Sequence, residues 1–232
     1  MSRSSRGSIL GVTLFAAVVG GGFAPLLAAV PIAHYPLQSD GVDATGINDP
    51  MLLDTAPFQN GGVYCNGIYV AQPGGFTVKT PLISSLNFES LAFSVEFKID
   101  ELPTDFRRPI LVGGHSYRWL GAEINPNGKL GFLHNNSNHT ETAIDVSINV
   151  WHQIVITYES TSRTGRLYLD SQPAMSAEFD LEQNGDRDFQ AYNPANATAF
   201  KGILRELVVY DTWYDPTPAD GTSWGAVKAL YR

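Results

Sequence analysis

Two short segments of the chain combine aromatic, imidazole and amide side chains in a pattern typical of sugar-binding surfaces. The first is GGHSYRWLG, residues 113–121, and the second is LHNNSNHT, residues 133–140. Aromatic rings stack on sugar rings, and amide and imidazole groups form hydrogen bonds with hydroxyl groups. The candidate ligand-binding residues are His115, Tyr117, Trp119, His134, Asn135, Asn136 and Asn138. In the alternative interpretation, the tryptophan enters the core and the asparagines only form a loop.

Oxygen-bearing side chains are concentrated in a second segment, SDGVDATGIND, residues 39–49. Asp40 and Asp43, with Asn48 and Asp49 close by, offer the oxygen ligands that calcium prefers. The same residue types also form tight turns by hydrogen bonding to their own backbone. The sequence therefore leaves two interpretations open: a structural calcium ion at Asp40 and Asp43, or a loop held by turns alone.

The sequence displays no catalytic constellation. The dense acidic stretch VEFKIDE places Glu96 and Asp100 on one strand face with Lys98 between them, which is typical of an exposed polar face. The glycosidase pattern Glu-x-Asp-x-x-Glu, a Gly-x-Ser-x-Gly motif and a glycine-rich phosphate loop are all absent, and the five histidines lack zinc-site spacing. We therefore predict that the chain is not an enzyme.

The two candidate sugar-binding segments would be neighbours if the residues between them form a β-hairpin. The residues NPNG at 125–128 predict such a turn between AEI and KLGF, because asparagine and glycine tolerate positive φ angles. Apolar and polar residues alternate in FSVEFKID at 93–100 and in AIDVSIN at 143–149, a pattern typical of half-buried antiparallel strands. Strand-like segments recur about every ten residues, which predicts an all-β sandwich or barrel. Only residues 220–232, DGTSWGAVKALYR, predict a short C-terminal helix.

The first 33 residues differ in composition from the rest of the chain. Two arginines precede a long uncharged run with small residues near its end, which predicts a signal peptide cleaved near residues 28–33 and a domain over residues 34–232. An uncleaved segment would instead anchor the protein in a membrane. With residues 1–33 removed, 13 basic and 23 acidic side chains remain, a balance of −10. This charge argues against nucleic-acid partners, and we expect a secreted, cell-surface or periplasmic protein.

Cys65 is the only cysteine of the chain, so no intramolecular disulfide can form. It lies in the strand-like segment GGVYCNGIYV, which favours a buried thiol. The alternative is an intermolecular disulfide.

The segment WHQIVITY at 151–158, followed by a polar turn and RLYLD at 166–170, resembles the laminin-G-like, or concanavalin A-like, jelly-roll domains. HYPLQSDGVDATG, LAFSVEFKIDELP, NPNGKLGF and FKGILRELVVYD are similar to further segments of that family and occur in its order. The resemblance implies an antiparallel jelly-roll β-sandwich. We expect Trp151 to fill the space between the sheets, with Ile154, Ile156 and Tyr158 alternating inward.

Two departures from the family pattern concern turns and metal binding. Asp170 is followed by Ser171 where the family often has glycine, which predicts a different turn. Arg205 stands where several relatives have a calcium-binding aspartate, while Glu206 keeps the following acid, and a guanidinium there would oppose a divalent cation.

By resemblance, we expect a noncatalytic recognition module that binds a glycan. The alternatives are an adhesion or structural module that binds an extracellular protein surface, and a divergent glycan-cleaving enzyme. The first predicts an exposed Trp119 near Tyr117. The second predicts a broad apolar patch, and the third predicts two carboxylates facing one cleft.

Overall fold

The computed structural model describes residues 30–53, 56–66, 79–83, 86, 89–104, 108–113, 120–134, 138–181, 188–191, 200–212 and 216. These residues form an all-β structure, as the alternating sequence pattern predicts. The strands are β1 (Pro31–Tyr35), β2 (Phe58–Gln59), β3 (Gly62–Asn66), β4 (Ser90–Ile99), β5 (Arg108–Gly113), β6 (Leu120–Ile124), β7 (Lys129–His134), β8 (Asn138–Asp145), β9 (His152–Glu159), β10 (Thr164–Leu169), β11 (Gln172–Glu178), β12 (Phe189–Gln190) and β13 (Lys201–Tyr210).

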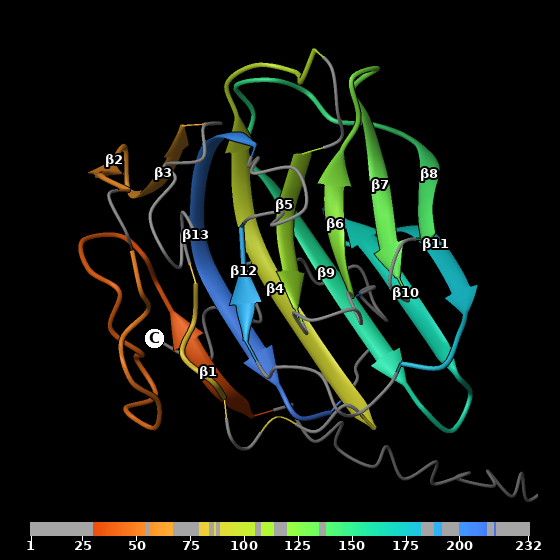
Figure 1. The fold of residues 1–232 in the computed structure, drawn as a ribbon, viewed down its shortest axis with the longest axis horizontal. Coiled ribbons are helices and arrows are strands. Elements are labelled where there is room, and N and C mark those ends of the chain that lie inside the picture. The colour runs from red at the N-terminus through yellow and green to blue at the C-terminus, as the bar shows by residue number, and fades with distance from the viewer. Residues whose placement is uncertain are drawn as a thin grey trace, which may run out of the picture.

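The strands form two antiparallel sheets that lie face to face (Figure 1). One sheet has eight strands, seven of which follow the order β11-β10-β9-β4-β13-β3-β2. The eighth strand, β1, pairs with residues 207–210 of β13, whereas β3 pairs with residues 201–204. The second sheet has five strands in the order β12-β5-β6-β7-β8. This arrangement confirms the predicted jelly-roll sandwich.

The core lies between the two sheets and follows from the alternation of apolar side chains. Phe93, Val95, Phe97 and Ile99 of β4 are at most 1% exposed, while Glu96 and Lys98 point to the outer face. In β9, Ile154 and Ile156 are fully buried, and they pair across the hairpin with Leu169 and Leu167 of β10. This inward set was predicted from the sequence.

Tight turns fix the register of the hairpins. The predicted NPNG turn joins β6 to β7, with the Gly128 amide donating to the Asn125 carbonyl at 2.9 Å and Gly128 at a φ of 81°. At the hairpin from β10 to β11, Asp170 and Ser171 both have positive φ angles, 50° and 66°. A two-residue turn with two positive φ angles normally uses glycine or asparagine. The hairpin nevertheless forms here with Asp170 and Ser171, so the predicted change of turn residue leaves the fold intact.

The structure differs from the sequence-based expectations at several strand ends. The strand expected over residues 143–149 ends at Asp145, and Ile148 lies on an exposed turn at 48% exposure. That strand, β8, begins at Asn138, inside a segment that was expected to be a loop. β1 begins at Pro31, inside the range of residues 28–33 in which cleavage was predicted, and Ala33 is fully buried.

The expected C-terminal helix at residues 220–232 and the strand-like segment GIYVAQ lie outside the described residues. Within the described ranges, no helix is long and apolar enough to cross a bilayer. Cys65 is fully buried in β3, and burial raises the pKa of its thiol, which confirms the expectation of a buried cysteine.

Candidate functional site

The structure places the ends of the two candidate sugar-binding segments next to each other. Gly113, the last residue of β5, pairs with Leu120, which in turn pairs with His134, the last residue of β7. His134 then pairs with Asn138 at the start of β8. The predicted hairpin therefore brings the strand ends that flank residues 114–119 and 135–137 to one end of the five-stranded sheet. Five of the candidate residues lie outside the described residues: His115, Tyr117, Trp119, Asn135 and Asn136.

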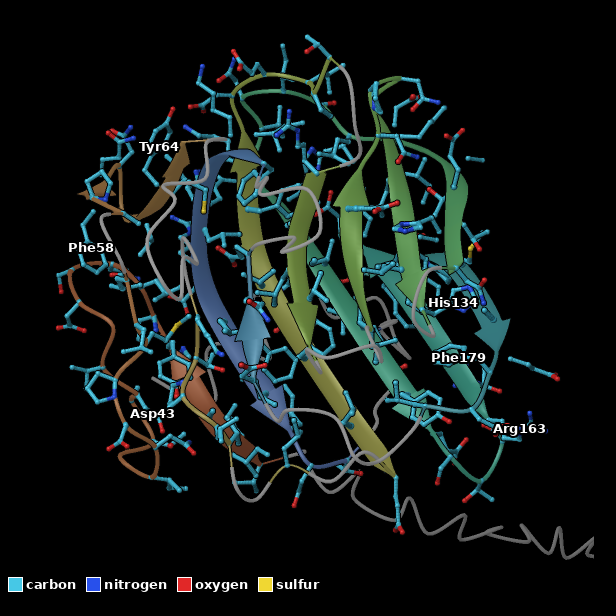
Figure 2. The ribbon with its side chains drawn as sticks, viewed as in Figure 1. Asp43, Phe58, Tyr64, His134, Arg163 and Phe179 are labelled. Carbon is cyan, nitrogen blue, oxygen red and sulfur yellow. The ribbon has the colours of Figure 1, made fainter. Side chains whose placement is uncertain are left out.

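The two described candidates pair with each other but differ in exposure. Asn138 is exposed, as a ligand-binding residue would be. His134 is 8% exposed and points between the sheets, where its ring stacks on Phe179 with a centroid distance of 4.9 Å (Figure 2). Its Nε2 lies 3.2 Å from Thr140 Oγ1, and burial lowers the pKa of the imidazole. His134 thus packs on the core side of β7, and its contact with a ligand stays a prediction.

A cluster of polar side chains that the sequence analysis missed lies on the outer face of the five-stranded sheet. It consists of Glu123 and Asn125 at the end of β6, Asn127 of the turn, and His139 and Glu141 of β8; we call these five residues the outer polar cluster. Leu120, Ala122 and Ile124 belong to the core, so the alternate positions of β6 face outward. The sequence contained a sign of this cluster: residues 123, 125 and 127, and residues 139 and 141, are spaced two apart, so the side chains of each set point to one face of an extended chain.

Gly131 at the centre of β7 makes this cluster sterically feasible. Glu123 pairs with Gly131, and Gly131 pairs with Glu141, so the three residues form one row across the sheet. A Cβ atom at Gly131 would lie 2.7 Å from Cγ of Glu123. Without that atom, the Glu123 side chain reaches over β7 to His139, where Oε2 lies 2.9 Å from Nδ1.

Amide groups hold the second carboxylate of the cluster. Asn125 and Asn127 both donate from Nδ2 to Oε2 of Glu141, each at 3.0 Å. Glu141 and Asn127 are exposed, whereas Glu123 and Asn125 are each 3% exposed. The cluster is therefore a polar surface that is fixed from below by buried groups and open to solvent at Glu141.

The candidate calcium residues Asp40 and Asp43 accept hydrogen bonds from residues in and next to their own loop. Asp43 is buried, and its carboxylate accepts hydrogen bonds from the amides of His34, Thr45 and Asn48 and from the side chains of Thr45 and Asn48. Burial alone would raise the pKa of Asp43, but these donors outweigh it and lower the pKa to about 2. Asp40 accepts from the amide of Val42 at 3.1 Å, as in an Asx turn. Within the described part of the chain, no group of three or more His, Cys, Asp or Glu side chains is arranged to hold a metal ion.

Glu206 connects this loop to the last strand. It lies in a bulge of β13 with a φ of 54°, and its carboxylate contacts His34 Nε2 at 3.0 Å and accepts from Gln38 Nε2 at 3.0 Å. The hydrogen bond from His34 lowers the pKa of Glu206. The N-terminal segment and the last strand therefore meet at Glu206, with an imidazole and an amide as its contacts.

Trp151 is not a core plug, contrary to the expectation. Ile154 and Ile156 point inward, so Trp151 and Gln153 have the opposite parity and lie on the outer face of the eight-stranded sheet. The guanidinium carbon of Arg205 lies 3.9 Å from the centroid of the Trp151 ring. The inward position at this end of β9 is occupied by His152, whose ring centroid is 5.7 Å from that of Phe97.

The two antiparallel sheets and their strand order define a β-sandwich of the jelly-roll class. Residues 73–217 match the sequence profile of the concanavalin A-like lectin/glucanases superfamily, and the chain belongs to this superfamily.

Solved structures with the same fold include enzymes and an isolated domain. Trypanosoma rangeli sialidase is 17% identical with a TM-score of 0.63, and the match covers 79% of this chain but only 31% of the sialidase chain. Domain 4 of AbnA, a GH43 extracellular arabinanase from Geobacillus stearothermophilus in complex with arabinotriose, is 17% identical with a TM-score of 0.56. That match covers 81% of this chain and 95% of the domain. At these identities the likeness shows the fold alone. No curated protein sequence matches the chain.

Proposed function

We propose that this protein is a noncatalytic, exported carbohydrate-binding module that holds a glycan on the outer face of its five-stranded sheet. The observation that carries the proposal is the outer polar cluster, which lies on the strands next to the candidate segments at residues 113–121 and 133–140. The AbnA domain with its bound arabinotriose supports the proposal by analogy of fold.

The cluster offers the groups that a polyhydroxylated ligand requires. Glu141 is exposed, and both asparagine amides donate to the same oxygen, Oε2. Its other oxygen, Oε1, can therefore accept a hydrogen bond from a sugar hydroxyl. The ion pair between buried Glu123 and partly exposed His139 supports the surface, so little side-chain freedom is lost when a ligand binds.

The same geometry favours binding over glycan cleavage. Glu123 and Glu141 lie in one row two strands apart, which corresponds to about 9–10 Å between their backbones. A glycosidase needs one carboxylic acid that is free to protonate the leaving group and one that activates water or attacks the sugar. Here Glu123 contacts an imidazole, and Glu141 is held by two amides, so both carboxylates act as fixed acceptors.

A glycan-array screen of the exported, processed protein, with and without calcium, tests the proposal. We expect selective binding that weakens about tenfold or more in Glu141→Gln and in Trp119→Ala, because each removes one directed contact of about 1.5 kcal/mol. Arg163→Ala is the matched control, because Arg163 is an exposed ion-pair residue in the turn between β9 and β10 of the other sheet (Figure 2). Calcium-dependent binding would support the proposed metal site at Asp40 and Asp43.

Protein binding is the second candidate function, and exposed aliphatic side chains favour it. Val42, Ile47 and Leu52 of the first loop are 53%, 67% and 51% exposed. If the array shows no binding under either calcium condition, the carbohydrate proposal is wrong. Loss of adhesion to extracellular protein in Ile47→Ser and Leu52→Ser would then support this second function.

A further inference from the structure

A second surface with aromatic and polar groups lies on the outer face of the eight-stranded sheet, away from the outer polar cluster. Its centre is Trp151, which is partly exposed. Arg205 stacks on the ring at 3.9 Å, and the Lys98 ammonium lies 5.8 Å from the ring centroid. The cation–π contact with Arg205 fixes the ring in one orientation.

Strand register places further side chains around this ring. Arg205 pairs with Glu96, and Glu96 pairs with Gln153, which gives a row across β13, β4 and β9. The next row runs from Tyr64 of β3 through Ile203 to Lys98 and ends beside Trp151. We call this surface the Trp151 platform; its members are Tyr64, Glu96, Lys98, Trp151, Gln153 and Arg205.

The platform is partly open, unlike the adjoining positions at the middle of the same sheet face. Trp151, Lys98, Gln153 and Tyr64 are all partly exposed. Further along the same face, Ser94, Val155, Thr157 and Tyr168 are at most 3% exposed. A ligand on this face would therefore contact the platform end, where β4 ends and β9 begins.

The charges on the platform compensate one another. Arg205 Nε lies 2.7 Å from Glu96 Oε2, and at the neighbouring edge Lys201 Nζ lies 3.0 Å from Glu101 Oε2. Counting Lys98 and Asp100 with these two pairs gives three cations and three carboxylates, a sum of zero. A surface with no net charge that carries an aromatic ring, an amide and paired ions suits a neutral hydroxyl-rich ligand better than an anionic one.

We propose that the Trp151 platform is a second carbohydrate-binding site, specific for uncharged oligosaccharides. A sugar ring stacks on the exposed part of Trp151, while Gln153 and Lys98 hydrogen-bond to its hydroxyls. Tyr64 and Trp151 stand three strand spacings apart, about 14 Å, so an extended oligosaccharide can contact both rings. Because the platform and the outer polar cluster lie on opposite sheets, one molecule could bridge two glycan chains.

Titration of the exported protein with arabinotriose and with maltotriose, followed by NMR amide shifts, tests this site directly. We expect shifts at Lys98, Gln153 and Arg205 that persist in Glu141→Gln, which leaves the platform intact. Gln153→Ala and Trp151→Phe should each raise the dissociation constant for these shifts, by up to about tenfold. Trp151→Phe keeps an aromatic ring in place, so a folded spectrum separates lost binding from lost structure.

The charge argument is tested by comparing lactose with 3′-sialyllactose and by adding salt. We expect equal or weaker binding of the acidic sugar at the platform and no loss of arabinotriose affinity over about one decade of ionic strength, from about 50 to about 500 mM salt. Shifts confined to Asn125, His139 and Glu141 would overturn the second site while leaving the proposed function standing. A platform response only to the acidic sugar would overturn the assigned ligand class.

Discussion

Gly131 is the residue whose substitution tests the architecture of the outer polar cluster most directly. In Gly131→Ala, the new methyl group would lie 2.7 Å from Cγ and 2.9 Å from Oε1 of Glu123. Cγ is in the middle of the side chain and cannot move aside without a change of rotamer. We therefore expect Glu123 to leave its position over β7 and to lose its 2.9 Å contact with His139.

The expected cost follows from two opposing contributions. A hydrogen bond that involves a charged group contributes about 1.5–3 kcal/mol, and alanine in a strand is favoured over glycine by about 0.5–1 kcal/mol. The free energy of unfolding should therefore fall by about 1–2 kcal/mol. A Glu123→Ala background removes the three atoms nearest to the new methyl group, so there Gly131→Ala should stabilise the protein by about 0.5–1 kcal/mol.

Urea unfolding of the four proteins in this double-mutant cycle measures both values. The change of sign between the two backgrounds is the diagnostic result, because independent sites add to within about 0.5 kcal/mol. If Gly131→Ala costs the same with and without the Glu123 side chain, the glycine does not act by making room for the carboxylate, and our account of the cluster is refuted.

Three further predictions concern other parts of the fold. Ser171→Gly should raise the free energy of unfolding by about 0.5–1 kcal/mol, because residue 171 has a φ of 66°. Ser176→Gly in the extended β11 should lower the free energy of unfolding by a similar amount. Equal effects of the two substitutions would contradict the role of the turn. The pKa of Asp43 is lowered to about 2, so its contribution of about 2 kcal/mol is complete above pH 4 and is lost as pH falls toward 2. The stability difference between wild type and Asp43→Asn should shrink over that range in acid titrations, and a constant difference would count against this assignment. Cys65 is fully buried with a raised thiol pKa, so Ellman's reagent should label it only after unfolding, and rapid labelling of the native protein would show that β3 opens.

The strands that could be predicted from the sequence are those whose apolar pattern is bounded by clear turn residues. The segments KLGFLH and HQIVITYE coincide with β7 and β9 because NPNG precedes one and a polar turn follows the other. The segment AIDVSIN also alternates, but Val146 donates its amide to Gly128, and the strand has already ended at Asp145. Alternation alone does not show where strand pairing stops.

Side-chain direction accounts for the remaining errors. Trp151 was assigned inward because tryptophan is large and apolar, although the parity of Ile154 and Ile156 already placed it outward. Leu130 and Phe132 likewise give His134 the inward parity, which the sequence analysis did not use when it proposed this residue as a ligand contact. The outer polar cluster requires the register between β6, β7 and β8, which depends on a bulge between Lys129 and Gly131 that the sequence does not reveal.

The position of β13 in the eight-stranded sheet determines when the sheet can be completed during synthesis. β13 lies between β4 on one side and β3 and β1 on the other, yet it is the last of the described strands to leave the ribosome. Until then, β1 and β3 have no partner on the β13 side, and one edge of β4 stays open. Such long-range pairing slows folding and leaves strand edges exposed to other chains. A nascent chain that ends before residue 201 should therefore remain unfolded, and folding should begin only after the whole domain has been made.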